Sequence, residues 1–190
     1  MRSEAIKLLA LSGSLRHDSF NRGLLRAAQE VAPVGVELVP YDDWADAEPY
    51  NEDLEGSVPG GAAAVRERIS EADGLLIATP EYNGGVPGAL KNALDWASRP
   101  HGLSPLAGKP VAVISSSPSP FGATWAGESL RRALSLSGAQ VVDGELAIGK
   151  VSELFENGEL ADSAARARIG RLVEELAETV AATEVSAVAA

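Results

Sequence analysis

The chain has no cysteine and only two histidines, His17 and His101, among its 190 residues. The absence of cysteine excludes disulfides, thiolate chemistry and cysteine-based metal or iron–sulfur sites. Two histidines also exclude a histidine-rich metal site, so we expect no bound metal. Both histidines fall in polar loops, where a solvated side chain is the ordinary interpretation, although His17 could also contact an anionic ligand.

Long apolar runs and positive charge are lacking as well. No apolar run approaches the length needed to cross a bilayer, and the run at 8–11 is too short for a signal-peptide core and has no cleavage site after it. The formal net charge is −11, and an acidic protein repels the phosphates of nucleic acids and of anionic membranes. We therefore expect a cytoplasmic protein with neither as a partner. Any anionic ligand must then be held by a local cationic or amide-rich site.

Short apolar runs alternate with amphipathic segments along the chain, and hydrophobic residues make up an ordinary 45%. The continuously apolar runs predict strands that are buried on both sides of a parallel sheet, with helices on both faces. The predicted strands span 6–11, 36–39, 74–78, 111–114 and 140–148, the last interrupted at 143–144; the predicted helices span 21–31, 63–72, 87–97, 125–137 and 161–182. We expect one domain over residues 1–182 and a disordered tail over 183–190.

Ligands of such sheets bind beyond the carboxyl ends of the strands, so the loop after the first strand is informative. Its sequence at 12–21, SGSLRHDSFN, combines a tight-turn glycine, short polar side chains and one cation: Gly13, Ser14, Ser19, Asn21 and Arg16. With the helix N-terminus that follows, this set suits a phosphate dianion. It is neither the dinucleotide fingerprint nor a Walker loop. A plain Ser/Asn helix cap with a solvated arginine is the alternative.

The loop after the third strand reads TPEYNGGVPGALKNALDW at 79–96. Its glycines and prolines predict a fixed backbone that can approach the edge of a flat heterocycle, and Tyr82 can cover the face or edge of a ring. In the helix that begins near Pro87, Lys91 and Asp95 are interpreted as an exposed i,i+4 pair. Trp96 is interpreted as a core residue, with a subunit interface as the alternative.

Three hydroxyl groups follow the fourth strand, at 115–117. Serines at the end of a strand can form hydrogen bonds with ligand carbonyls or ring nitrogens. A Ser/Pro-rich surface loop is the alternative that this segment favours when it is considered alone.

Together, GSLR at 13–16 with Ser19 and Asn21, and PEYN at 80–83 running into VPGALKNALDW at 86–96, resemble the NADPH-dependent FMN reductase family, which contains quinone, chromate and azo-dye reductases. The resemblance covers residues 6–147. It implies a flavodoxin-like three-layer α/β sandwich with a five-stranded parallel sheet of order 2-1-3-4-5. It also implies one FMN per subunit and NADPH, or NADH, as co-substrate.

The resemblance also implies which residues bind the cofactor. By it, Ser14, Arg16, Ser19 and Asn21 match the loop that holds the FMN phosphate. The residues that match the loop beside the isoalloxazine are Pro80, Glu81, Tyr82 and Asn83, and Ser116 matches a flavin contact after the fourth strand. Two departures bear on this site: Gly84-Gly85 stands where relatives often carry an aromatic or polar residue, which predicts a more open pocket, and PSPF at 118–121 replaces a glycine-rich stretch.

The implied reaction is ping-pong hydride transfer through the flavin to a small-molecule acceptor such as a quinone, an azo dye, chromate or free flavin. No catalytic acid or base is expected, because the cofactor carries the chemistry. Relatives pair as homodimers or homotetramers, and we expect the same here. Three alternatives stay open: a flavodoxin-type electron carrier that does not itself oxidise NAD(P)H, a flavin-free phosphate-binding module, and a supplier of reduced FMN to a monooxygenase.

Overall fold

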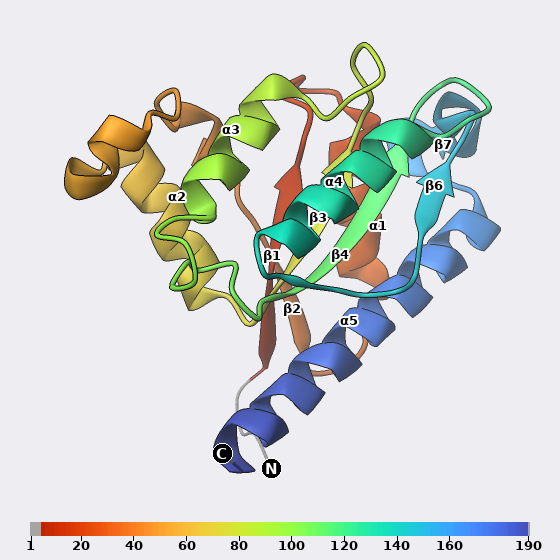
Figure 1. Cartoon of the computed structure of the whole chain (residues 1–190). Coiled ribbons are helices and arrows are strands. Elements are labelled where there is room, and N and C mark those ends of the chain that lie inside the picture. Colours follow the sequence, from red (N-terminus) through yellow and green to blue (C-terminus); the bar gives the residue numbers. More distant parts are fainter. Residues whose placement is uncertain (1–4, 190) are drawn as a thin grey trace.

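One twisted sheet forms the centre of the protein, and its parallel strands run in the order β2-β1-β3-β4-β5 (Figure 1). The computed structural model describes residues 5–189, with backbone only for residues 184 and 186–189. Residues 1–4 of the expected domain and residue 190 of the expected tail lie outside the described residues. The strands are β1 (Ile6–Ser12), β2 (Val36–Pro40), β3 (Gly74–Thr79), β4 (Pro110–Ser116), β5 (Gln140–Val141) and β6 (Leu146–Ile148). This is the predicted flavodoxin-like topology.

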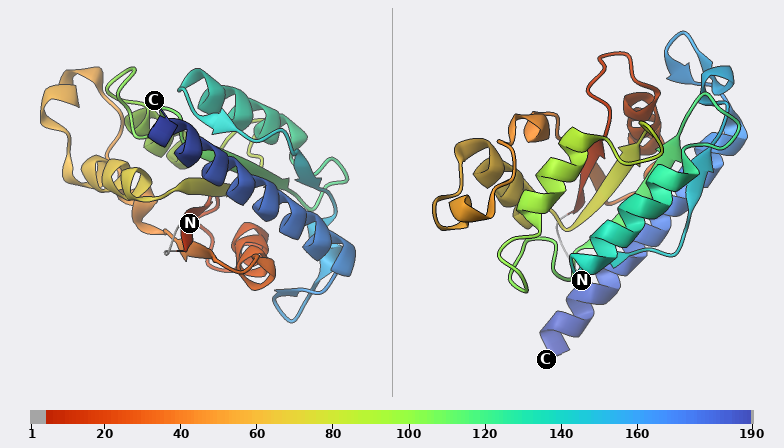
Figure 2. Two further views of the ribbon diagram at one scale, coloured as in Figure 1. Left: turned by 90° about the horizontal axis from the view of Figure 1, so that it is seen from below. Right: turned by 45° about the horizontal axis from the view of Figure 1, so that its top comes forward.

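Helices cover both faces of the sheet, as the pattern predicts. Helices α3 (Gly88–Ala97) and α4 (Thr124–Leu136) lie in front of the sheet in Figure 1, with α2 (Gly60–Glu71) beside α3. Helices α1 (Phe20–Val31) and α5 (Ser163–Ala189) pack against each other on the opposite face, and Figure 2 shows the two helical layers from below and from the upper edge.

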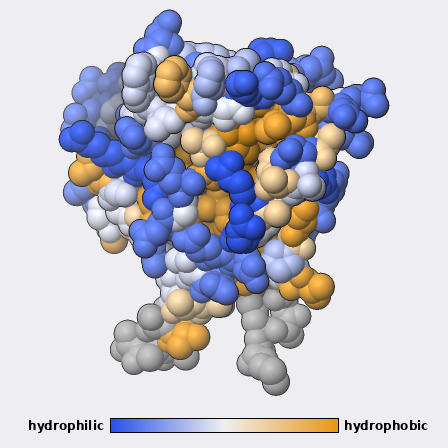
Figure 3. Space-filling model, turned by 90° about the vertical axis from the view of Figure 1, so that its right-hand side faces the viewer, coloured by the Kyte–Doolittle hydropathy of each residue, from blue (hydrophilic) through white to orange (hydrophobic). Residues whose placement is uncertain are grey.

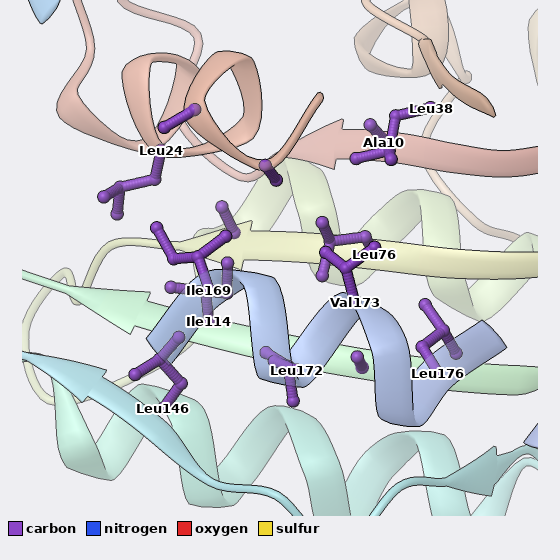
Figure 4. Close-up of a cluster of buried hydrophobic side chains, with 14 of the residues drawn as sticks. Ala10, Leu24, Leu38, Leu76, Ile114, Leu146, Ile169, Leu172, Val173 and Leu176 are labelled. Atoms are coloured by element: carbon purple, nitrogen blue, oxygen red, sulfur yellow. The ribbon is translucent and has the colours of Figure 1, made fainter. Parts of the chain in front are cut away.

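The alternation of side chains along each strand builds two separate cores. Ala10 of β1 and Leu76 of β3 belong to the core that also contains Val173 and Leu176 of α5 (Figure 4). Their neighbours Leu9, Leu11, Leu75 and Ile77 belong to the second core, under α2, α3 and α4. Every residue of β3 and β4 is buried, which explains why those strands read as continuously apolar rather than alternating.

The predicted fifth strand is broken where Asp143-Gly144 interrupts its sequence. β5 pairs with the start of β4 and β6 with its end, and residues 142–145 leave the ladder between them. The guanidinium of Arg131 donates to the carbonyls of Val142 and Gly144 at 2.8 and 3.2 Å, and Gly144 N donates to Glu175 Oε1 at 3.0 Å. Side chains from two helices thus satisfy the backbone groups that the break exposes.

Three parts of the chain differ from the predicted elements. Between the second predicted strand and the second predicted helix, where no element is predicted, the chain forms two 3-10 helices, η1 (Asp43–Asp46) and η2 (Glu52–Ser57). A third, η3 (Val151–Leu154), follows β6. A short antiparallel pair, β7 (Phe155–Glu156) and β8 (Glu159–Leu160), precedes α5. Helix α5 itself extends to Ala189, beyond the predicted end at residue 182, so the tail expected at 183–190 is helical as far as the structure describes it.

The face on the right-hand side of Figure 1 carries apolar side chains that are crossed and bordered by hydrophilic ones (Figure 3).

Within the described residues, no helix combines the length and the apolar character that a bilayer crossing requires. That part of the chain also has no group of three or more carboxylate, histidine or cysteine side chains arranged to hold a metal ion.

Candidate active site at the carboxyl edge of the sheet

The strand register brings the three predicted loops together at one edge of the sheet. Ser12 pairs with Ala78 and Thr79 pairs with Ser115, so β1, β3 and β4 end at the same level. The right-hand view of Figure 2 brings this edge forward. The loops 12–19, 80–87 and 117–123 therefore border one site, at the place where open α/β sheets bind ligands.

Gly13 is required by the close approach of the first two loops. Its N–H donates to the Ala78 carbonyl at 2.7 Å. A Cβ at this position would lie 2.9 Å from Leu90 Cδ2 and 3.3 Å from Pro80 Cδ. The absent side chain lets the first loop pass directly against the PEYN loop and α3.

The helix-cap interpretation of the first loop is confirmed. Ser19 is the N-cap of α1, and its Oγ accepts a hydrogen bond from Asn21 N at 3.2 Å. Ser14 is 2% exposed, and its Oγ accepts from Arg16 N at 3.4 Å. The side chains of Ser14, Ser19 and Asn21 are all buried, whereas Arg16 is exposed and its guanidinium makes no hydrogen bond or ion pair with residues 5–189.

The donor set of this loop fits a phosphate group. Ser14 and Ser19 present hydroxyls, α1 presents the free N–H groups of its first turn, and Arg16 adds a cation whose charge no described carboxylate neutralises. In a chain of net charge −11, such a locally cationic, amide-rich loop is what an anionic ligand requires. The cap does not compete with this role, because it leaves the other first-turn N–H groups free.

Ser116 and Asn21, predicted separately as cofactor contacts, bind each other. Ser116 Oγ donates to Asn21 Oδ1 at 3.0 Å, and the two residues are 2% and 4% exposed. The bond joins the end of β4 to the first turn of α1. Because a hydroxyl has one proton, Ser116 is left with acceptor capacity toward a ligand.

The PEYN loop contains a two-residue hairpin turn. Tyr82 and Gly85 exchange backbone hydrogen bonds, each 3.1 Å long, around Asn83 and Gly84. Asn83 (φ 53°) and Gly84 (φ 76°) both adopt positive φ, as an Asn-Gly type I′ turn requires. The turn holds Tyr82 half exposed and Asn83 exposed at the edge of the site.

Glu81 joins this loop to α4. Its Oε2 accepts a hydrogen bond from Ala126 N at 3.1 Å. The cap residue of α4, Ala123, has no side-chain oxygen to offer, so the partly buried carboxylate of Glu81 replaces the missing cap and interacts favourably with the helix dipole. Glu81 therefore has a structural partner in addition to the predicted place beside the flavin ring.

Sequence reasoning missed a clamp between α3 and the segment after η1. Asn92 Oδ1 accepts from Tyr50 N at 2.7 Å, while its Nδ2 donates to the carbonyls of Ala47 and Glu48, each at 3.0 Å. Trp96 is fully buried, and its Nε1 donates to the same Glu48 carbonyl at 2.7 Å. The one signal in the sequence was the presence of hydrogen-bonding side chains, Asn92 and Trp96, in an otherwise apolar helix.

Trp96 is a core residue, as the first interpretation states, and Lys91 pairs with Asp95 through Nζ and Oδ1 at 2.5 Å. His17 is 99% exposed and lies 3.0 Å from Asp18 Oδ1. Both histidines are solvated.

These features define a class: a flavodoxin-like α/β protein whose loop at the switch between β1 and β3 has a donor set suited to a phosphate. A sequence model of the NADPH-dependent FMN reductase family matches residues 6–153. The chain belongs to this family, and it is therefore an oxidoreductase that uses FMN and NAD(P)H.

Individual relatives agree with this assignment. The chain is 45% identical to a 2-hydroxy-1,4-benzoquinone reductase of a Burkholderia species over 127 residues, which cover 67% of this chain and 69% of the relative. It is 39% identical to a quinone reductase of Pseudomonas putida over 163 residues, covering 84% and 87% of the two chains. Among solved structures, the flavoenzyme NAD(P)H:acceptor oxidoreductase FerB from Paracoccus denitrificans is 31% identical, with a TM-score of 0.84 and coverage of 94% and 99%.

Proposed function

We propose that this protein catalyses the two-electron reduction of quinones by NAD(P)H, with FMN bound at the carboxyl edge of β1, β3 and β4. The observation that carries the proposal is the convergence of the three loops, with the unneutralised Arg16 on one side and the exposed Tyr82 on the other. Similarity to two proteins named quinone reductases supports the choice of acceptor.

Each part of the site has a role in this proposal. Arg16, Ser14 and Ser19, with the first turn of α1 and Asn21, hold the phosphate of the cofactor through charge and hydrogen bonds. The turn formed by Tyr82 and Asn83, supported by Pro80 and by Glu81, orients the ring edge, and Ser116 accepts a hydrogen bond from it. When bound, FMN supplies the hydride transfer between nicotinamide and acceptor.

The protein itself contributes orientation rather than acid–base chemistry. Hydride transfer is the chemistry of the flavin, so the proposal requires no side chain to act as a nucleophile. The half-exposed Tyr82 and the side-chain-free Gly85 support a site that is open on one face. Donor and acceptor can then use the same place in turn, which is the structural condition for ping-pong turnover.

Steady-state kinetics test the proposal. With FMN supplied, NADPH oxidation should depend on an added quinone, and double-reciprocal plots at several quinone concentrations should be parallel lines. Intersecting lines would refute the ping-pong scheme. NADPH oxidation that requires a partner reductase would instead identify an electron carrier, and reduced FMN released without quinone reduction would identify a flavin supplier.

Three further expectations belong to the same proposal. Both cores share one sheet, which supports a single folding unit over residues 1–182. We propose that the protein acts in the cytoplasm with a small-molecule acceptor, and that it assembles as a homodimer or a homotetramer. Light scattering on a sizing column would measure the assembly.

A further inference from the structure

Exposed aromatic side chains occur at only one place on the molecule. The chain has three tryptophans, three tyrosines and three phenylalanines, and all of them lie within the described residues. Three are exposed: Tyr82 at 50%, Phe121 at 80% and Trp125 at 69%. All three belong to the loops that follow β3 and β4 or to the first turn of α4, and the six others are buried or half-buried.

This concentration is not the scatter of single apolar residues that any surface shows. Isolated exposed side chains such as Val34, Leu103 and Leu136 occur elsewhere and need no explanation. In contrast, the three aromatic residues share one edge of the sheet with Leu15, which is 55% exposed in the loop after β1. Exposed apolar groups from three loops around one site indicate a surface that a ligand or a partner covers.

Trp125 is held in place against the hairpin turn. A Cβ built on Gly84 would lie 3.7 Å from Cε3 of the indole, so the ring packs over the side-chain-free part of the turn. The neighbouring backbone is fixed by the hydrogen bond from Ala126 N to Glu81 Oε2 at 3.1 Å. Trp125 is therefore positioned by two loops while most of its surface remains available.

We propose that Tyr82, Phe121 and Trp125 form an aromatic wall that recognises the planar, apolar ring of the acceptor, and that Trp125 determines the preference for bicyclic quinones over small polar acceptors. This inference rests on the proposed function. The indole has the largest face of the three side chains, and offset stacking of aromatic rings adds attraction beyond the area that they bury.

The test compares two acceptors at saturating NADPH in the FMN-loaded enzyme: menadione, a bicyclic quinone, and ferricyanide, a small hydrophilic anion. Trp125→Ala should raise the KM for menadione about three- to tenfold, and Trp125→Phe should restore most of that loss. The KM for ferricyanide and the FMN dissociation constant should change by less than about twofold. Leu136→Ala, at the exposed far end of the same helix, should match wild type with both acceptors.

Two results would refute the proposed role of Trp125. The same KM change with menadione and ferricyanide, or no change with either, would show that Trp125 does not select the acceptor. A change of molecular mass in light scattering for Trp125→Ala would show that a second copy of the chain covers these rings. Failure of the proposed function looks different, because wild-type enzyme would then fail to bind FMN or to oxidise NADPH with any quinone.

Discussion

Replacing Asn92 with alanine should destabilise the protein far more than replacing Lys91, the exposed residue beside it. The amide of Asn92 makes three hydrogen bonds to the segment that follows η1: one from Tyr50 N at 2.7 Å, and one each to the carbonyls of Ala47 and Glu48 at 3.0 Å. No other side chain of the described residues bonds Tyr50 N, so the substitution leaves backbone groups without their partner.

The magnitude follows from these bonds. A net contribution of about 0.5–1.5 kcal/mol for each hydrogen bond, reduced because water can reach part of this site, predicts a loss of about 1.5–3 kcal/mol in the free energy of unfolding. For a domain of this size, the loss corresponds to a decrease in Tm of about 3–12 °C. Asn92→Asp should also destabilise the protein: it can still accept the bond from Tyr50 N, but a carboxylate cannot donate to the two carbonyls.

Thermal unfolding monitored by circular dichroism measures this effect, with urea unfolding as a second determination of the free energy. Lys91→Ala is the matched control. It changes the adjacent residue of the same helix but removes only an exposed pair with Asp95, which should be worth less than about 0.5 kcal/mol. If Asn92→Ala had the same Tm as the Lys91→Ala control, the stabilising role assigned to the Asn92 hydrogen bonds would be refuted.

Two other substitutions test the site and the core. Arg16→Ala should weaken FMN binding about 10- to 100-fold, because it removes a charge-assisted contact to phosphate. Fluorescence titration measures the FMN dissociation constant. The control is Arg171→Ala, which removes an exposed arginine on α5 and should leave FMN binding unchanged. Tyr41→Phe should increase stability by about 1 kcal/mol, because the buried Tyr41 hydroxyl has no partner within the described residues. Tyr50→Phe is its opposite control, since the Tyr50 hydroxyl bonds Glu55 at 2.6 Å, and an equal response of the two variants would contradict this reasoning.

The Tyr41 hydroxyl also makes stability depend on pH. Burial, followed by the charge of Asp43, raises the pKa of Tyr41 above its usual value of 10.0. The folded state therefore keeps the phenolic proton at a pH where the unfolded chain releases it, so this group makes stability decline as the pH rises from about 10 toward the higher folded-state pKa. Urea midpoints measured across this range should decline less in Tyr41→Phe, and an unchanged slope would assign the decline to other groups.

The parts of the fold that depend on local pattern could be predicted from the sequence. Residues 74–78 are apolar throughout because β3 is buried on both faces, and the turn at Asn83-Gly84 follows from residues that tolerate positive φ. The break at Asp143-Gly144 was visible because these two residues interrupt the predicted fifth strand. The order of the strands came from the family resemblance, because no local pattern determines which strand lies beside which.

The parts that depend on distant partners could not be predicted. η1 and η2 sit in a segment with few apolar residues, and the clamp that holds it comes from α3, more than 40 residues along the chain. β7 and β8 have two residues each; their place depends on Phe155, whose ring packs against Phe20 with centroids 5.1 Å apart. Within the site, the Ser116–Asn21 and Glu81–Ala126 bonds likewise join loops that only the folded sheet brings together.

The central claim is that the carboxyl edge of this sheet binds FMN in a form that NAD(P)H reduces. The most direct test is the visible spectrum of the purified protein under anaerobic conditions, recorded before and after addition of FMN and then of NADPH. The account predicts a yellow, protein-bound flavin whose absorbance bleaches when NADPH is added. A protein that takes up no FMN, or that holds FMN which NADPH leaves oxidised, would contradict it.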